Sequence, residues 1–138
     1  MFSRIMVPVD LVHADKLQRA IDVSSQLARN YGAEVVYVGV TAATPSPVAH
    51  TPDEYRQKLD AFAKEHADKG GHAARGHAII AHDPAVEIDK QLEHAGEELG
   101  ADLIVMATHV PGLGDSWSPN HGGAIARHSK ISVFLVRG

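Results

Sequence analysis

The amino-acid sequence predicts an α/β fold, a doubly wound parallel sheet of five strands with helices on both faces. Two observations predict this fold. Short β-branched runs alternate along the chain with longer segments whose apolar residues recur at helical spacing. The connections have the length of helical crossovers, so the strands are expected to lie parallel and the crossovers to be right-handed. The 138 residues contain no linker or internal repeat and fit a single domain, residues 1–138.

The first half of the chain predicts two strands and two helices. Ile5–Val9 is a short apolar run, and Val35–Val40 is nearly continuously apolar, as expected of a strand covered on both faces. Between these runs, Gly32 ends a helix whose apolar residues are Leu17, Ala20, Ile21, Leu27, Ala28 and Tyr31. After a proline-rich loop, Thr51 is expected to cap a second helix that has Pro52 in its first position. The buried face of this helix is expected to carry Tyr55, Leu59, Phe62, Ala63 and His66.

The second half predicts three further strands and two further helices. Gly70 and Gly71 end the second helix, and residues 72–81 form a weaker strand candidate. A third helix opens at Asp83-Pro84, ends at Gly100 and is expected to bury Ile88, Leu92, Ala95 and Leu99. The remaining elements in chain order are a strand at Leu103–Ala107, a loop at Val110–Gly123, a short helix at Ala124–His128 and a strand at Ile131–Val136.

The composition excludes several classes of function. Lysine and arginine number 13 against 17 aspartates and glutamates, which argues against sequence-independent nucleic-acid binding. The absence of cysteine excludes disulfides, thiol catalysis and zinc–thiolate sites. No apolar run approaches the roughly 20 residues that a membrane-spanning helix needs. The N-terminal residues lack a signal-peptide layout, so we expect a cytoplasmic protein with neither nucleic acid nor membrane as its partner.

The fold class predicts where a ligand would bind. Ligands of doubly wound sheets bind beyond the carboxyl ends of the strands, at the point where the strand order reverses. This rule selects Pro8–Asp10, Val38–Val40 and the loop that starts at Ala107. Small residues in that loop would let backbone N–H groups approach an anion, but a solvent-exposed loop with turn glycines would have the same composition. The GxGxxG and GxxxxGK[ST] patterns are both absent, so a Rossmann dehydrogenase or a P-loop kinase is not supported.

Three segments together resemble the universal stress protein family over nearly the whole chain: Ile5–Asp10, Ala101–His109 and Ala126–Arg137. The resemblance implies a parallel sheet in the order 3-2-1-4-5, of the adenine nucleotide alpha-hydrolase-like type. It also implies a homodimer formed through the last strand, Ile131 to Val136. Some members of the family bind ATP and others do not.

The resemblance implies roles for individual residues. Asp10 would lie beside the adenine and ribose, and a backbone group near Val38 would contact the adenine. The family's phosphate motif has the form G-x2-G-x9-G-[ST]. Here Ala107 and Val110 stand at the first two glycines, while the final pair corresponds to Pro119-Asn120 or, after a shift, to Gly122-Gly123. The expected nucleotide site, for ATP or AMP, comprises Pro8, Val9, Asp10, Val38, Ala107, Thr108, His109, Val110, Gly112, Asn120, His121, Gly122 and Gly123.

Several of these residues also have structural interpretations. Asp10 would equally serve as the N-cap of the helix that follows it. Thr108 and His109 could donate to a phosphate or ribose, or could satisfy the backbone of their own loop. Asp115 suits a phosphate site only if Mg²⁺ bridges the two anions. Trp117 would cover a ligand or a dimer partner, or would pack over the edge of the core.

The histidines and the loop serines give little support for a metal site or for catalysis. His72, His77 and His82 are evenly spaced, but in a strand His77 would face away from the other two, so no metal site is expected. With ten histidines, a response to pH between about 5 and 8 is a hypothesis. The chain has no GxSxG motif, and the Ser116, Ser118 and His121 cluster has no identifiable orienting group.

These observations favour a regulatory protein over an enzyme, with at most slow ATP hydrolysis. Binding of an adenine nucleotide between the ends of the first, second and fourth strands would order the loop Val110–Gly123 and change the surface shown to a partner. The alternative is a family member that binds no nucleotide and acts through its dimer or partner surface, with Val110, Pro119 and Trp117 filling the crevice. A hydrolase is a third interpretation.

Overall fold

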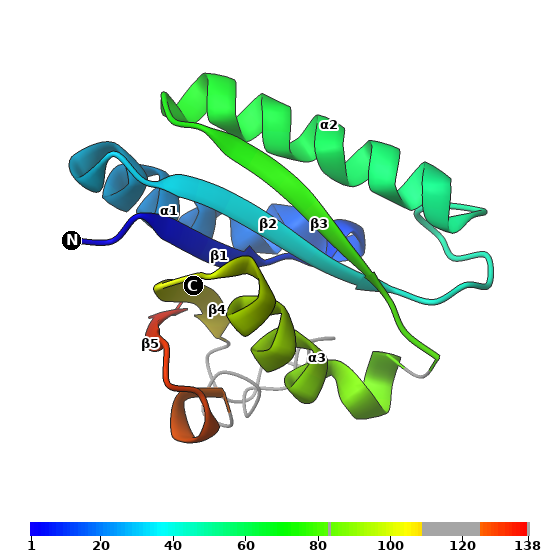
Figure 1. Cartoon of the computed structure of the whole chain (residues 1–138). Coiled ribbons are helices and arrows are strands. Elements are labelled where there is room, and N and C mark those ends of the chain that lie inside the picture. Colours follow the sequence, from blue (N-terminus) through cyan, green and yellow to red (C-terminus); the bar gives the residue numbers. More distant parts are fainter. Residues whose placement is uncertain (83, 109–124, 138) are drawn as a thin grey trace.

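The computed structural model describes residues 1–82, 84–108 and 125–137, with residues 84–87 described by their backbone alone. Its centre is a five-stranded parallel sheet in the order β3-β2-β1-β4-β5 (Figure 1). Both the fold class and the expected strand order are confirmed. The strands are β1 (Arg4–Pro8), β2 (Glu34–Thr41), β3 (Ala74–Ile80), β4 (Leu103–Thr108) and β5 (Ser132–Arg137).

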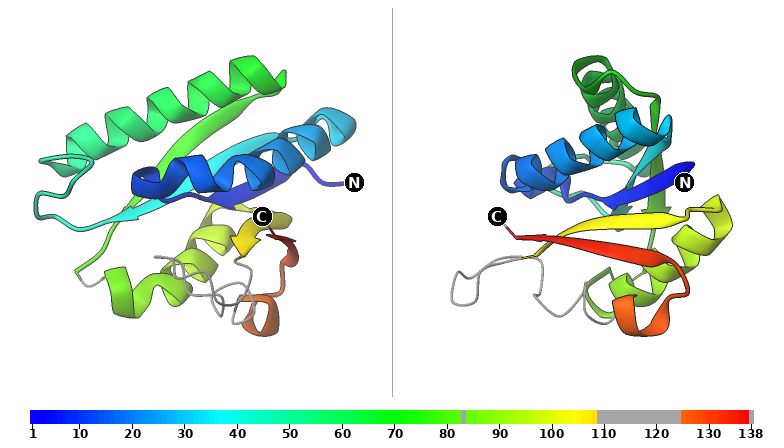
Figure 2. Two further views of the ribbon diagram at one scale, coloured as in Figure 1. Left: turned by 180° about the vertical axis from the view of Figure 1, so that it is seen from behind. Right: turned by 90° about the vertical axis from the view of Figure 1, so that its left-hand side faces the viewer.

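Helices cover both faces of the sheet (Figure 2). On one face, α1 (Gln18–Tyr31) and α2 (Pro52–Gly70) bury a core with the side chains of β1 and β2 that point toward them. On the other face, α3 (Pro84–Leu99) and the helical turn at 125–128 pack on the opposite side chains of the same strands. This two-faced burial explains why the central strands read as continuous apolar runs.

The predicted helix ends are confirmed by their backbone geometry. Thr51 caps α2, because its side-chain oxygen accepts a hydrogen bond from the Glu54 N–H at 3.1 Å. Gly32 and Gly71 end α1 and α2 with φ of 66° and 70°, a left-handed conformation that glycine adopts without steric cost.

The segment between β1 and α1 differs from the prediction. The apolar spacing predicts a helix from Leu17, but a 3-10 helix, η1 (Leu11–Leu17), precedes α1. His13 has non-helical angles inside η1 (φ −120°, ψ 33°), so the chain kinks immediately after β1. A pattern with a 3.6-residue period does not detect such a short, tightly wound segment.

The amino ends of β1 and β4 are held together by a single carboxylate. Asp102 accepts hydrogen bonds from the backbone N–H groups of Ser3 (2.8 Å) and Arg4 (3.0 Å), and from the Ser3 hydroxyl. Burial alone would raise the pKa of Asp102, but these donors outweigh it and lower the pKa below its usual value. These hydrogen bonds fix the amino end of β1 beside β4. They thereby help to position the rest of β1, including its carboxyl end.

Candidate functional site

The strand order reverses between β1 and β4, and the pairing of these two strands stops early. Ile5 pairs with Leu103 and Met6 with Ile104, and these are the last pairs although both strands continue beyond them. Pro8 contributes to this early end because proline has no N–H to donate. In the part of the chain that the structure describes, this is the position that the rule for doubly wound sheets selects for a ligand.

Asp10 lies at this edge, directly after β1, and the structure shows it as an N-cap. Its Oδ1 accepts a hydrogen bond from the Val12 N–H at 3.0 Å, and its Oδ2 lies 2.9 Å from His13 Nδ1. The capping interpretation of Asp10 is therefore confirmed. A carboxylate oxygen can accept more than one hydrogen bond, so the cap does not by itself exclude a ligand from Asp10.

His13 is a residue that the sequence reasoning missed. It is part-buried and forms an ion pair with Asp10 when its imidazole is protonated. The three-residue spacing from Asp10 to His13 is the signal that could have indicated the contact, because such a spacing brings side chains together over one helical turn.

Val38 lies inside β2, which continues to Thr41, one residue beyond the expected strand Val35–Val40. Val38 is the residue that faces Pro8 at the end of β1, and its carbonyl oxygen accepts a hydrogen bond from the Val9 N–H at 2.8 Å. The side chains of Val9 and Val38 are both buried, so neither of them offers its side chain to a ligand.

Tyr55 is a second residue whose role at this edge the sequence did not predict. Its burial on α2 was expected, but its hydroxyl lies against Gly39 of β2, where a Cβ would overlap the hydroxyl oxygen and lie 3.0 Å from Cζ. Burial raises the pKa of Tyr55 and the negative charge of Asp10 raises it further, so the phenol stays neutral. Asp10 and Tyr55 therefore belong to one neighbourhood at the carboxyl ends of β1 and β2.

β4 brings two of the expected residues to the same edge. Ala107 and Thr108 are half-buried at its carboxyl end, where they pair with Val136 and Arg137 of β5. The other expected residues of the fourth-strand loop lie outside the described residues, namely His109, Val110, Gly112, Asn120, His121, Gly122 and Gly123. Asp115, Ser116, Trp117, Ser118 and Pro119 lie outside them as well.

His72, His77 and His82 are not grouped as metal ligands. Among residues 1–82, 84–108 and 125–137, no group of three or more histidine, aspartate or glutamate side chains is placed to hold a metal ion. His72 instead forms a hydrogen bond with Ser25 on α1, with 2.9 Å between Oγ and Nε2. None of the described helices has both the length and the apolar character needed to cross a bilayer.

Comparison with known proteins identifies the family. The model of the universal stress protein family matches residues 1–137. The chain belongs to the universal stress protein family. The resemblance found in the sequence is therefore confirmed.

Solved structures of universal stress proteins share this fold. One from Burkholderia pseudomallei is 21% identical, with a TM-score of 0.67 over 97% of this chain and 95% of that chain. One from Archaeoglobus fulgidus in complex with dAMP is 17% identical, with a TM-score of 0.68 over 96% of each chain. Another, in complex with cAMP, is 19% identical, with a TM-score of 0.67 over 99% of this chain and 97% of that chain.

Proposed function

We propose that this universal stress protein is a cytoplasmic regulatory protein that binds an adenine nucleotide, AMP or ATP, at the carboxyl ends of β1, β2 and β4. The observation that supports this most is the early end of the β1–β4 pairing at the point where the strand order reverses. Two structural relatives hold dAMP and cAMP, which supports adenosine monophosphates as the ligand class.

The proposed pose assigns one part of the nucleotide to each strand end. The adenine lies beside the backbone of β2 after Val38, and the ribose hydroxyls donate to the carboxylate of Asp10. The phosphates lie beyond Thr108, where backbone N–H groups of the following loop would bind them. ATP would also require Mg²⁺ to offset Asp115. We assign the site to sensing rather than to turnover, with at most slow ATP hydrolysis.

The same proposal includes a homodimer that forms through the last strand. β5 lies at one edge of the sheet, and its Phe134 and Leu135 are 45% and 42% exposed. Strand edges with exposed apolar side chains are prone to pair with another chain. Pairing with a second copy would cover Phe134 and Leu135.

A second candidate function has one specific observation in its favour. Both carboxylate oxygens of Asp10 are already engaged, one by the Val12 N–H and the other by His13. A ligand that bound Asp10 would have to share it or displace His13. This arrangement favours a family member that binds no nucleotide and acts through its dimer or partner surface.

Calorimetric titration with AMP, Mg-ATP, cAMP and dAMP distinguishes the two functions. We expect AMP to bind, and Asp10→Asn to weaken its binding about tenfold, the equivalent of one charge-assisted hydrogen bond. Asparagine retains the cap, although it also removes the charge that pairs with His13. We expect Asp53→Asn, an exposed change in the first turn of α2, to leave affinity unchanged. Failure of all four nucleotides to bind at millimolar concentration would refute the sensor and support the second candidate.

A further inference from the structure

The outer edge of β3 lies at the opposite side of the sheet from β5. Among the described strands, β3 pairs only with β2. The Val35 N–H donates to the Ala73 carbonyl at 3.0 Å, and the Ala81 N–H donates to the Thr41 carbonyl at 2.8 Å. Successive residues of a strand direct their backbone groups to opposite sides, so the odd-numbered residues of β3 face β2. The even-numbered residues direct their N–H and C=O groups away from β2, namely Ala74, Gly76, Ala78 and Ile80.

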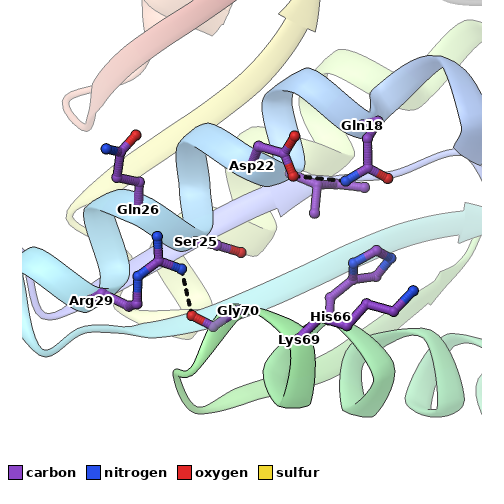
Figure 3. Close-up of a pocket in the computed structure, with 9 residues that line it drawn as sticks. Gln18, Asp22, Ser25, Gln26, Arg29, His66, Lys69 and Gly70 are labelled. Atoms are coloured by element: carbon purple, nitrogen blue, oxygen red, sulfur yellow. Dashed lines mark hydrogen bonds between the residues drawn. The ribbon is translucent and has the colours of Figure 1, made fainter.

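One flank of α2 lies beside this edge. On its other flank α2 meets α1, where Arg29 Nη1 donates to the Gly70 carbonyl at 2.6 Å (Figure 3). A Cβ at Gly76 would lie 3.0 Å from Asp60 Oδ1, so the Asp60 carboxylate is placed over Gly76. A groove of about 310 Å³ follows the edge and is lined by Arg56, Leu59, Asp60, Gly76, His77 and Ala78.

The exposed charges on this flank of α2 alternate in sign. In chain order they are Asp53, Arg56, Asp60 and Lys64, three or four residues apart and therefore on one side of the helix. Arg56 Nη1 donates to Asp53 Oδ1 at 2.8 Å, but a guanidinium has further N–H donors. Asp60 and Lys64 form no ion pair with any described residue. Two antiparallel copies of this charged flank would be complementary, because acid meets base at each position.

The strand and the charged flank share one centre of symmetry. Two antiparallel copies of β3 centred on His77 match all seven residues of the strand, with Gly76 facing Ala78 of the partner subunit. The charged flank is centred at Lys58. Because α2 and β3 run in opposite directions (Figure 1), and one strand residue of about 3.3 Å spans about two helix residues, Lys58 is level with His77 when Asp60 lies over Gly76.

The position of α2 leaves room for a second copy. Tyr55 lies against Gly39 of β2 and Leu59 against Gly76 of β3, so α2 is seated over both strands. Neighbouring strands are about 4.8 Å apart, so a helix centred between β2 and β3 would lie about 10 Å from its copy across the paired edges. Packed helices are commonly separated by about this distance.

We propose that the β3 edge and the charged flank of α2 bind a second copy of this chain, related by a two-fold axis at His77. Asp60 then meets Arg56 of the partner subunit, Lys64 meets Asp53 of the partner subunit, and each contact occurs twice. Most side chains at the edge are small, and surface ion pairs contribute little, so the contact forms at about millimolar rather than micromolar concentration. If copies also pair through β5, as in the proposed function, this contact joins those dimers into longer assemblies.

The test uses the Leu135→Lys variant, which is directed against pairing through β5, so neither that pairing nor a nucleotide is needed. Between about 20 µM and about 1 mM protein, the mass in sedimentation equilibrium should rise toward that of a dimer. Amide shifts should change with concentration at the even-numbered residues of β3. Arg75, His77 and Ile79 should shift less, because their N–H groups already face β2.

Charge reversal tests the two-fold arrangement. Asp60→Arg and Arg56→Asp should each weaken association about tenfold, because each converts two attractive contacts into repulsive ones. The double variant Arg56→Asp/Asp60→Arg restores opposite charges across the axis, and its dissociation constant should return to within about threefold of the starting value. Arg19→Asp, the same change on the exposed surface of α1, is the control and should have no effect.

Three results would overturn the proposal. The edge amides could keep their shifts up to about 1 mM, or the double variant could associate no better than the single variants. Shifts independent of protein concentration would indicate a different occupant of the β3 edge.

Discussion

Replacing Gly39 with alanine is predicted to destabilise the protein through one defined overlap. A Cβ at Gly39 would overlap the Tyr55 hydroxyl oxygen and would lie 3.0 Å from Cζ and 3.1 Å from Cε1. Tyr55 is 4% exposed, so its ring has little room to move away. Overpacking of this kind costs about 1–3 kcal/mol, which for a chain of this size lowers Tm by about 3 °C per kcal/mol.

The identity of the overlapping atom can be tested with a double-mutant cycle. Tyr55→Phe removes the oxygen but leaves Cζ and Cε1 in place, so Gly39→Ala should cost about 1 kcal/mol less in the Tyr55→Phe background. Urea denaturation of the wild type, both single variants and the double variant, at one protein concentration, measures this coupling.

Gly32→Ala is the matched control for this cycle. The space around Gly32 is open, but its φ of 66° disfavours alanine, so we expect a cost of about 1 kcal/mol from backbone strain alone. That cost should be the same in the wild-type and Tyr55→Phe backgrounds, because no contact with the Tyr55 side chain is involved. The packing account would be refuted if Gly39→Ala also cost the same in both backgrounds.

Three further predictions concern pH and assembly. Burial lowers the pKa of His66 from its usual 6.5, so the unfolded chain binds a proton at this imidazole more readily than the folded protein does. The free energy of unfolding should therefore fall as the pH drops below about 6.5. In urea titrations at several pH values, His66→Phe should reduce that fall. The folded protein lowers the pKa of Asp102, so the contribution of this carboxylate to the free energy of unfolding is present above pH 3.8 and is lost as the pH falls through the pKa of the folded state. Asp102→Asn should destabilise the protein at neutral pH and weaken the dependence of stability on pH in the acid range. Leu135→Lys should convert a dimer into a monomer in light scattering, whereas Gln57→Lys on the exposed surface of α2 should leave the mass unchanged; a dimer that survives Leu135→Lys would argue against assembly through β5.

The secondary structure could be predicted largely from the sequence because burial leaves a periodic signal. The buried residues Ala20, Ile21 and Ala28 of α1 were all expected from their spacing. Glycines with positive φ then marked the helix ends. The order of the strands came from the family resemblance, because periodicity alone does not specify which strands are neighbours.

The side-chain contacts of the candidate site could not be predicted in the same way. The Tyr55 hydroxyl reaches Gly39 only because α2 packs across β2, and Ser25 meets His72 across 47 residues of sequence. Such contacts depend on how helices are seated on the sheet, which no local pattern records. The alternative roles of Asp10 were both visible in the sequence, and the structure shows the cap.

The most direct test of the central claim is an NMR titration of the ¹⁵N-labelled protein with AMP. The account predicts saturable amide shifts at Val9, Asp10, Gly39 and Thr108, with Ser25 and Gly70 on the helical side unaffected. It would be contradicted if millimolar AMP, with or without Mg²⁺, left the strand-end amides in place, or if the largest shifts fell on residues away from the carboxyl ends of β1, β2 and β4.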